Sequence, residues 1–410
     1  MKKMSMICAA AALGAGTVLA LATPARAATC ASYPNPVYIA GSSAVQPLLQ
    51  TIAGPLGQAT PPVSIIYQSV GSCVGVSDIT TPTSEVATAN YIDPTTGTLT
   101  ACTFPATGIP LDIGVSDVFP ATCGVTLPSG QTDFHGPNQV MTYVVPKGSS
   151  ESSISADAAY TVFGFGGTTY TVAPWTDPAY YFIRKPTSGV INMLAGACLT
   201  QGCSGGNGLA TTKWKGVQEA NGSNGVLADL TGLGATQPGK SIGILATDLA
   251  DGNRSTIKIL AYQASGQTCG YLPDSSSTSF DKINVRQGRY GVWGPLHLIA
   301  NVGAGGTPTS AAAAALISYF TGTGITTPQA KLVLDAEVKA HVVPQCAMQV
   351  SRATEDGPTA SYQPDVPCGC YYESSVGGAS ASCKTCPNGD GDCAATPSTP
   401  KCRYGYCEAK

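Results

Sequence analysis

One order of three elements constrains the fold most. A strand-like run, a small polar turn and a helix start follow one another, and this order occurs at two distant places in the chain. At the first place, residues 37–40 are apolar, residues 41–44 form a Gly-Ser-Ser-Ala turn, and residues 45–52 have amphipathic helical spacing. At the second place, the polar turn 184–189 precedes the apolar run 190–195. Strands that alternate with helices in this way predict an α/β protein.

The second turn also has the chemistry of an anion site. Ser188 is a suitable helix N-cap, because its hydroxyl can accept a backbone N–H that the helix leaves unpaired. Arg184 places a guanidinium four residues before this cap. A helix start with free N–H groups, a hydroxyl and a nearby Arg predicts a binding site for an oxyanion.

The first 27 residues have the pattern of a secretion signal. Lys2 and Lys3 form a basic start, residues 6–21 are an apolar run, and residues 25–27 are an Ala-Arg-Ala cleavage motif. We expect a signal peptide at residues 1–27 and a periplasmic or secreted mature protein. No later apolar run is long enough to span a bilayer, so no membrane span is expected after the signal is removed.

Composition limits the partners. The chain has 410 residues, which is enough for two or three domains, but only 11% of them are charged and the net charge is −3. This balance argues against nucleic acid and anionic membrane surfaces as partners.

Cysteine usage agrees with export. The chain has 16 cysteines, and removal of Cys8 with the signal leaves an odd number. Seven of them crowd into residues 368–407, which predicts a disulfide-rich module at residues 361–410. A local disulfide between Cys198 and Cys203 is also expected, and the odd count leaves a free thiol or an intermolecular partner.

The remaining elements follow from local patterns. Further strands are expected at residues 63–68, 111–115, 140–145, 241–245, and in two parts around Gly294 and Pro295 at residues 292–300. Further helices are expected at residues 155–163, 311–320 and 328–340. The polar, Thr-rich stretch 78–110 is interpreted as an inserted surface loop.

Several strand ends carry small polar or charged residues in a characteristic order. Gly-Ser-Ser-Ala-Val-Gln-Pro-Leu at residues 41–48 is similar to the Gly-Ser-Ser-Thr-Val-x-Pro-Leu motif of the phosphate-binding proteins of ABC importers. Residues 67–72, 114–117, 184–189 and 241–243 resemble further motifs of that family in the same order. The resemblance covers about residues 37–340 and leaves out the Cys-rich tail.

The resemblance implies a type II periplasmic-binding-protein fold, in which two lobes joined by a two-strand hinge close on one phosphate. Lobe I would comprise residues 30–137 and 290–350, and lobe II residues 138–289. By position, Ser43, Ser72 and Ser188 would donate hydroxyls to the ligand. The backbone N–H groups would come from Ala44, Gly189 and Val190, and the cation from Arg184.

Asp117 has a distinct implied role. A carboxylate repels an anion unless the ligand carries a proton that it can donate, so Asp117 would select hydrogen phosphate over sulfate. The chain departs from the family pattern at Ala44 and Val190, where Thr is usual, and at Pro186, where some relatives have an Asp.

These motifs predict an exported solute-binding protein that captures inorganic phosphate. The expected partners are phosphate and an ABC permease. Two alternatives remain open. One is a secreted surface or matrix protein with an attachment tail, and the other is a secreted phosphatase or serine hydrolase. The chain has three His, none in a recognisable metal or nucleophile motif, so no enzyme activity, metal or cofactor is expected.

Overall fold

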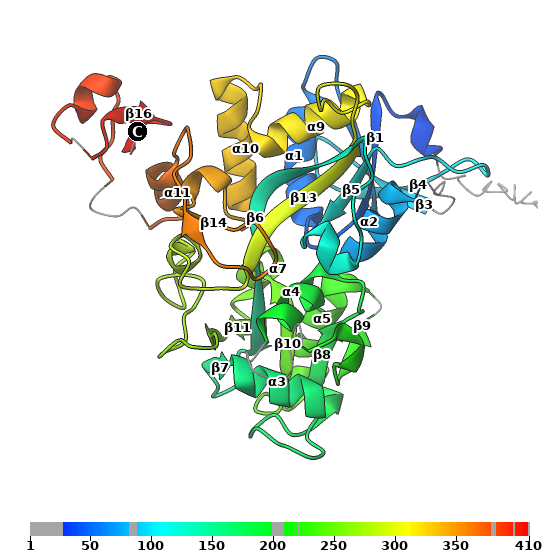
Figure 1. The fold of residues 1–410 in the computed structure, drawn as a ribbon, viewed down its shortest axis with the longest axis vertical. Helices are drawn as coiled ribbons and strands as arrows, with labels where there is room; N and C mark the ends of the chain where they lie inside the picture. The colour runs from blue at the N-terminus through cyan, green and yellow to red at the C-terminus, as the bar shows by residue number, and fades with distance from the viewer. Residues whose placement is uncertain are drawn as a thin grey trace, which may run out of the picture.

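The computed structural model describes residues 28–81, 88–198, 209–219, 221–378, 383–396 and 398–408. Its helices and strands form two lobes, one above the other in Figure 1, and the C-terminal segment lies beside the upper lobe. Strand β6 (Gln131–Pro146) runs through both lobes. The α/β architecture with two lobes and a disulfide-rich tail, predicted from the sequence, is confirmed.

Lobe I is built on a sheet whose central strands are parallel. Strand β1 (Pro36–Gly41) pairs with β2 (Ser64–Ser69) on one side and β5 (Ile113–Ser116) on the other. Side chains alternate between the two faces of a strand, so Val37 and Ile39 enter one core cluster while Ala40 enters another.

Helices cover both faces of this sheet. The larger core cluster lies under α1 (Gln46–Gly57), α9 (Ala311–Thr321) and α10 (Thr327–Lys339). The opposite cluster includes residues of α2 (Ser72–Thr80). Pro47 lies in the first turn of α1, where a missing N–H breaks no helical hydrogen bond.

The interpretation of residues 78–110 as a surface loop was wrong in part. Strands β3 (Thr88–Ile92) and β4 (Leu99–Thr103) form a hairpin that extends the lobe I sheet, because β3 pairs with β2. The hairpin buries Ala89 and Ile92, and a disulfide between Cys30 and Cys102 attaches it to the N-terminal segment. Polar composition concealed these two strands.

Lobe II is built on the other part of one 11-stranded sheet, which continues from lobe I through β6. Its strands are the second half of β6, β10 (Ile242–Ala246), β8 (Tyr181–Arg184), β9 (Val217–Glu219) and β11 (Ile257–Ile259). One face packs against α3 (Ala156–Phe165) and α4 (Gly189–Ala197), and the other against α5 (Gly222–Thr231).

The smaller elements complete the chain. The strands are β7 (Ser153–Ser155), β12 (Ala261–Gln263), β14 (Val350–Ser351), β15 (Ala360–Ser361), β16 (Lys401–Arg403) and β17 (Tyr406–Glu408). The helices are α6 (Leu233–Thr236), α7 (Thr247–Ala250), α8 (Ile283–Arg286) and α11 (Gly369–Ser375). No helix among the described residues is long and apolar enough to cross a membrane.

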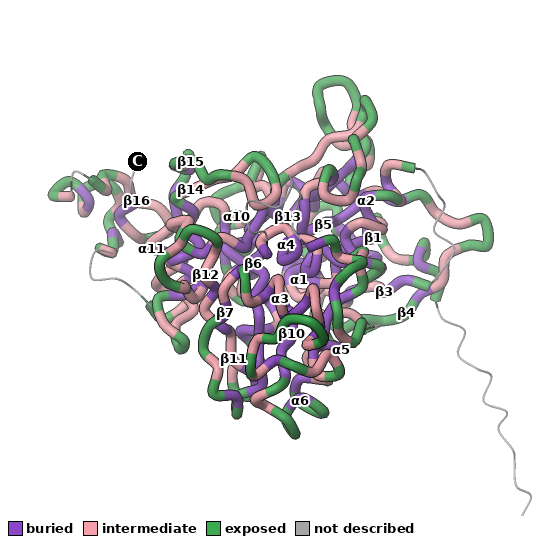
Figure 2. The backbone as a smooth tube through the Cα atoms, turned by 60° about the horizontal axis from the view of Figure 1, so that its bottom comes forward, coloured by how far each residue is buried: buried purple, intermediate pink, exposed green. Residues whose placement is uncertain are grey.

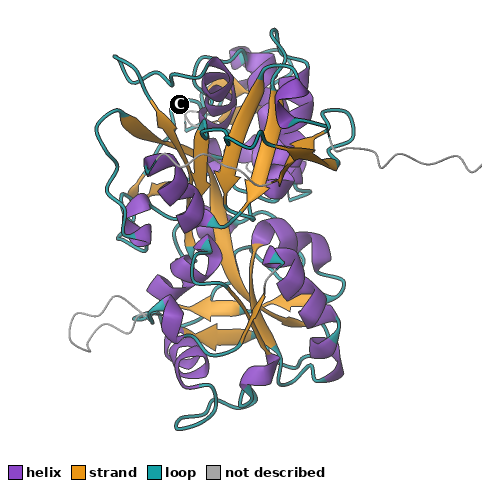
Figure 3. Ribbon diagram, turned by 90° about the vertical axis from the view of Figure 1, so that its right-hand side faces the viewer, coloured by secondary structure: helices purple, strands orange, loops and turns teal. Residues whose placement is uncertain are grey.

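Two adjacent strands connect the lobes (Figure 3). Strand β6 pairs with β13 (Trp293–Asn301) as far as Val140, and then with β10 from Met141 onward. The two parts expected around Gly294 and Pro295 are one continuous strand, with a register shift between Pro295 and His297. The crossing between lobes therefore lies near Val140 on β6.

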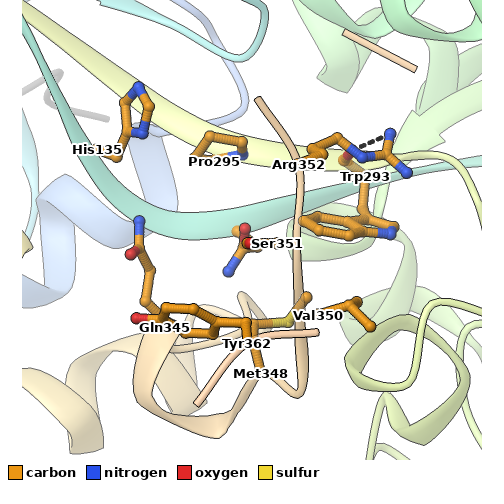
Figure 4. A pocket seen from close by; sticks show the side chains of 10 residues that line it. His135, Trp293, Pro295, Gln345, Met348, Val350, Ser351, Arg352 and Tyr362 are labelled. Carbon is orange, nitrogen blue, oxygen red and sulfur yellow. Dashed lines mark hydrogen bonds between the residues drawn. The ribbon is translucent and has the colours of Figure 1, made fainter. Parts of the chain in front are cut away.

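A later segment fastens this crossing. The Arg352 guanidinium donates to the carbonyl oxygens of Trp293 and Gly291, each at 2.9 Å, and lies 4.3 Å from the centre of the Trp293 ring. Figure 4 shows Arg352 against Trp293, with Pro295 and Tyr362 lining the same small cavity of about 70 Å³. The chain after lobe I thus crosses back over the hinge.

Disulfides organise the C-terminal module. Cys346–Cys368 joins it to the end of lobe I, and three more bonds lie inside it: Cys370–Cys383, Cys386–Cys402 and Cys393–Cys407. Figure 2 shows this module at the margin of the molecule, mostly exposed or half-buried, while buried segments gather in the lobes. The prediction of a disulfide-rich tail is confirmed.

Two described cysteines are unpaired. Cys198 is buried and Cys269 is exposed, and neither has a disulfide partner among the described residues. The expected partner of Cys198, Cys203, lies outside the described residues, so that prediction stays a prediction. A further disulfide, Cys73–Cys123, links α2 to the segment after β5.

Candidate functional site

The predicted site residues from four segments meet where the lobes face each other. In lobe I they follow strands β1, β2 and β5, whose carboxyl ends share one edge of the sheet. In lobe II they lie at the end of β8 and the start of α4. Ligands in open α/β sheets bind at such strand ends, so this boundary between the lobes, called the cleft from here on, is the candidate site.

Asp117 lies at the centre of the lobe I wall and is 1% exposed. Its Oδ2 accepts hydrogen bonds from the hydroxyls of Ser42, at 2.5 Å, and Ser72, at 3.2 Å. Its Oδ1 is buried and has no partner among the described residues. Burial raises the pKa of Asp117 to about 6, and the two hydroxyls and the Arg184 charge oppose this shift.

Arg184 ends β8 and spans the two lobes. Its Nη1 donates to Ser223 Oγ of lobe II at 2.8 Å, and its Nη2 to Ser43 Oγ of lobe I at 3.1 Å. Its Nε is buried without a partner among the described residues. Burial lowers the pKa of Arg184, while the negative charge of Asp117 opposes the change. Cation and anion thus lie close enough to interact across the cleft.

The start of α4 forms the third wall. Ser188 occupies the N-cap position, as predicted, but its hydroxyl makes no capping hydrogen bond. That part of the prediction was wrong, and the hydroxyl is free to meet a ligand. The N–H groups of Gly189 and Val190 have no hydrogen-bond partner among the described residues. A first helical turn leaves these donors unpaired, so they can bind an anion.

The lobes touch at this helix start. The Cys73 N–H donates to the Thr187 carbonyl oxygen at 3.0 Å. A Cβ atom on Gly189 would lie 2.5 Å from Ser72 Oγ and 2.7 Å from Asp117 Oδ2, which is too close for any side chain. Glycine is therefore required for the two lobes to approach each other here.

The Gly-Ser-Ser-Ala turn after β1 does not offer all the hydrogen-bond donors that were predicted for it. The Ala44 N–H donates to Ser42 Oγ at 3.0 Å, so in this arrangement it is already paired. Ser43 Oγ accepts from Arg184, which leaves its own proton to donate to a ligand. The methyl group of Ala44 and the side chain of Val190 both lie in the hydrophobic core.

Sequence reasoning missed three polar residues of this cleft. Ser42 donates to Asp117, and Ser223 accepts from Arg184. Ser223 follows Gly222 at the start of α5, so its context repeats the small polar turn before a helix that marked the other sites. Asp248, which follows β10, is buried with Oδ1 unpartnered, and burial and the Asp117 charge raise its pKa.

Among the residues that the structure describes, two groups of side chains have metal-ligand spacing, and both lie outside the cleft. Cys386, Cys393 and Cys407 are all consumed by disulfides. In the other group, His297 Nδ1 lies 2.7 Å from Asp133 Oδ2, with His135 nearby on β6. The cleft itself offers a guanidinium, hydroxyls, helix N–H groups and carboxylates. That set suits an oxyanion that also carries a proton.

No family model matches the chain, and no curated protein matches it. Solved structures do match. A phosphate ABC transporter substrate-binding protein from Clostridium perfringens with bound phosphate is 13% identical, with a TM-score of 0.47 over 76% of this chain and 99% of that one. An ABC-type phosphate transport receptor from Vibrio cholerae is 12% identical, with a TM-score of 0.45 over 75% and 99%.

A high-affinity periplasmic phosphate-binding protein is 16% identical, with a TM-score of 0.44 over 75% of this chain and 90% of that one. The proteins named in these matches are phosphate-binding proteins, the same family that the sequence motifs resemble. The TM-scores lie below 0.5, so the function is argued from the residues of the cleft alone.

Proposed function

We propose that this protein is an exported solute-binding protein that captures inorganic phosphate between its lobes, for uptake through an ABC permease. The observation that carries the proposal is a pair of unsatisfied buried atoms, an acceptor at Asp117 Oδ1 and a donor at Arg184 Nε. Buried polar atoms without partners are rare in proteins. A ligand that both donates and accepts hydrogen bonds supplies what this pair lacks.

Hydrogen phosphate is the oxyanion that fits this pair. Its unprotonated oxygens accept from Arg184 and from the N–H groups of Gly189 and Val190. Its hydroxyl can donate to Asp117 Oδ1, whereas fully ionised sulfate has no proton to donate and would be repelled. The carboxylate therefore supports selection for phosphate over sulfate.

The two Thr hydroxyls of the family pattern are absent at Ala44 and Val190, but other predicted hydroxyl donors remain available. Ser43 and Ser188 each keep a hydroxyl proton that has no acceptor among the described residues. Ser223 supports Arg184 from lobe II, where Pro186 replaces the Asp of some relatives. We infer that Arg184, these hydroxyls and the N–H groups of Gly189 and Val190 hold the ligand without a hydroxyl from residues 44 and 190.

Capture without chemistry is the expected activity. Asp117 is the positional candidate for a base beside Ser72, but it accepts two hydroxyls and is 1% exposed. Activation of a serine would need a base that can take its proton and release it again. We expect no turnover of a phosphomonoester such as p-nitrophenyl phosphate.

Calorimetry of the mature protein with phosphate tests the proposal. Replacement Arg184→Ala removes the buried cation, and we expect at least a ~100-fold loss of affinity, since charge-assisted hydrogen bonds contribute about 1.5–3 kcal/mol each. The matched control is Lys185→Ala, which removes an exposed neighbouring cation and should change the affinity less than about 3-fold. Equal phosphate affinity of Arg184→Ala and the unmodified protein would rule out this site, provided that circular dichroism shows a folded variant.

A further inference from the structure

A second cavity, of about 600 Å³, lies between lobe I and the C-terminal module. Helix α10 and the end of α9 form one wall, with Phe320, Val333 and Leu334 among the apolar residues. The segment after residue 361 and strand β16 form the other wall, with Tyr362 and Tyr404. Its volume is in the range of cavities that bind small molecules or single side chains.

Glu337, in the last turns of α10, lines this cavity although it is only 4% exposed. Its side chain has no hydrogen bond or ion pair with any described residue. Burial alone raises the pKa of Glu337 to about 8. A buried carboxyl group without a partner is unfavourable, and a bound cation would relieve this.

The other polar groups of the cavity leave Glu337 without a counter-charge. Asp365 adds a second carboxyl group, and Tyr319, Tyr362 and Tyr404 add aromatic rings. Arg403 is the one cation in the lining, and it makes no contribution to the pKa of Glu337. Carboxyl groups among aromatic and aliphatic walls favour a cation that carries an apolar chain.

We propose that this cavity binds an alkylammonium group, whose ammonium pairs with Glu337 and whose chain packs on Phe320 and Val333. A free amine and the lysine side chain of a protein partner share this chemistry. The cavity uses no residue of the phosphate cleft, so its occupation is separate from the proposed phosphate binding.

The test is calorimetry of the full mature chain with two probes, n-pentylamine for a free amine and N-acetyl-lysine methylamide for a lysine side chain. We expect the tighter probe to bind about 10-fold more weakly to Glu337→Gln, since the charged partner of the ammonium is lost. Glu151→Gln, in lobe II outside the cavity, is the matched control and should bind like the unmodified protein. Tighter binding of n-pentylamine indicates a free amine as the ligand, and tighter binding of N-acetyl-lysine methylamide indicates a lysine side chain of a protein partner.

The pH dependence separates ion pairing from simple packing. An alkylammonium stays charged from pH 6.5 to 8.5, but the Glu337 carboxyl must ionise to pair with it, so affinity should rise with pH. Asp365, Arg403 and the cavity tyrosines face the same space. The change of amine affinity with pH is therefore compared between the unmodified protein and Glu337→Gln, whose affinity should not change with pH.

A second variant protects the test against misfolding. Ala330→Trp places bulk in the cavity and leaves Glu337 intact, and it should also abolish amine binding. Phosphate binding should be unchanged in both variants. Failure of both amines to bind the unmodified protein at millimolar concentration, or equal binding to Glu337→Gln, would overturn the proposal.

Discussion

The cleft between the lobes and the C-terminal module are ordered by different forces. The cleft lies between two lobes that each contain a large apolar cluster. In the module, the buried cluster of residues 383–408 consists of Cys386, Cys393 and Cys407 with Cys402 packed against it. A segment with so few aliphatic residues cannot bury enough apolar surface to fold alone, so covalent links replace the core.

The comparison explains why the cleft can hold unfavourable groups. Large cores tolerate a buried carboxylate such as Asp117, whose pKa is raised to about 6 by that burial. In the module, the Lys401–Asp390 pair lies at the surface, and the buried Glu408 carboxylate is satisfied by the N–H groups of Cys370 and Tyr371. The cleft differs in that Asp117 Oδ1 and Arg184 Nε are buried there without a partner among the described residues.

The largest expected effect comes from the disulfides. The double change Cys393→Ala with Cys407→Ala opens a loop closed across 14 residues, which removes about 3 kcal/mol of stabilisation from the module. We expect residues 383–408 to become sensitive to limited proteolysis while phosphate affinity changes less than about 2-fold. A large loss of phosphate affinity would show that the two regions are not independent.

A substitution in the cleft should instead lower the affinity for phosphate. Gly189→Ala places a Cβ 2.5 Å from Ser72 Oγ, so closure of the lobes on the ligand is blocked. We expect about a 100-fold loss of phosphate affinity by calorimetry, equivalent to about 2.7 kcal/mol. The matched change in the module, Gly391→Ala, meets no atom within 4 Å and should have no effect. Normal binding by Gly189→Ala would contradict the closed arrangement of the cleft.

Loss of the support for Arg184 should have a smaller effect. Ser223→Ala leaves Nη1 without its lobe II acceptor, and the expected loss of phosphate affinity is about 10-fold. Ser374→Ala, which removes a hydroxyl contact to Tyr406 in the module, is the control. If both serine variants bind phosphate like the unmodified protein, Ser223 does not position the guanidinium.

Local sequence patterns predicted the parts of the cleft that depend on a strand end or a helix start. The strand before Asp117 and the helix after Ser188 were both expected, and both are present. The hairpin of β3 and β4 was missed, because its order depends on pairing with β2 and on the Cys30–Cys102 bond rather than on apolar alternation. Pairing between distant segments leaves little trace in local composition.

The partners inside the cleft could not be predicted for the same reason. Ser223 and Arg184 are 39 residues apart, and their hydrogen bond depends on the placement of α5 beside β8. The adjacent serines of one turn have different partners, since Ser42 donates to Asp117 while Ser43 accepts from Arg184. The residue types were visible in the sequence, but their pairing was not.

We propose that Asp117 selects its ligand by accepting a hydrogen bond from the ligand's own proton. Comparison of phosphate and sulfate binding tests this most directly. At pH 8 the carboxyl is ionised, so calorimetry should show phosphate binding and no sulfate binding. As the pH falls below about 6, Asp117 becomes protonated and can donate a hydrogen bond, so sulfate binding should appear. Asp117→Asn should bind sulfate at both pH values, and retained exclusion of sulfate by this variant at pH 8 would contradict the claim.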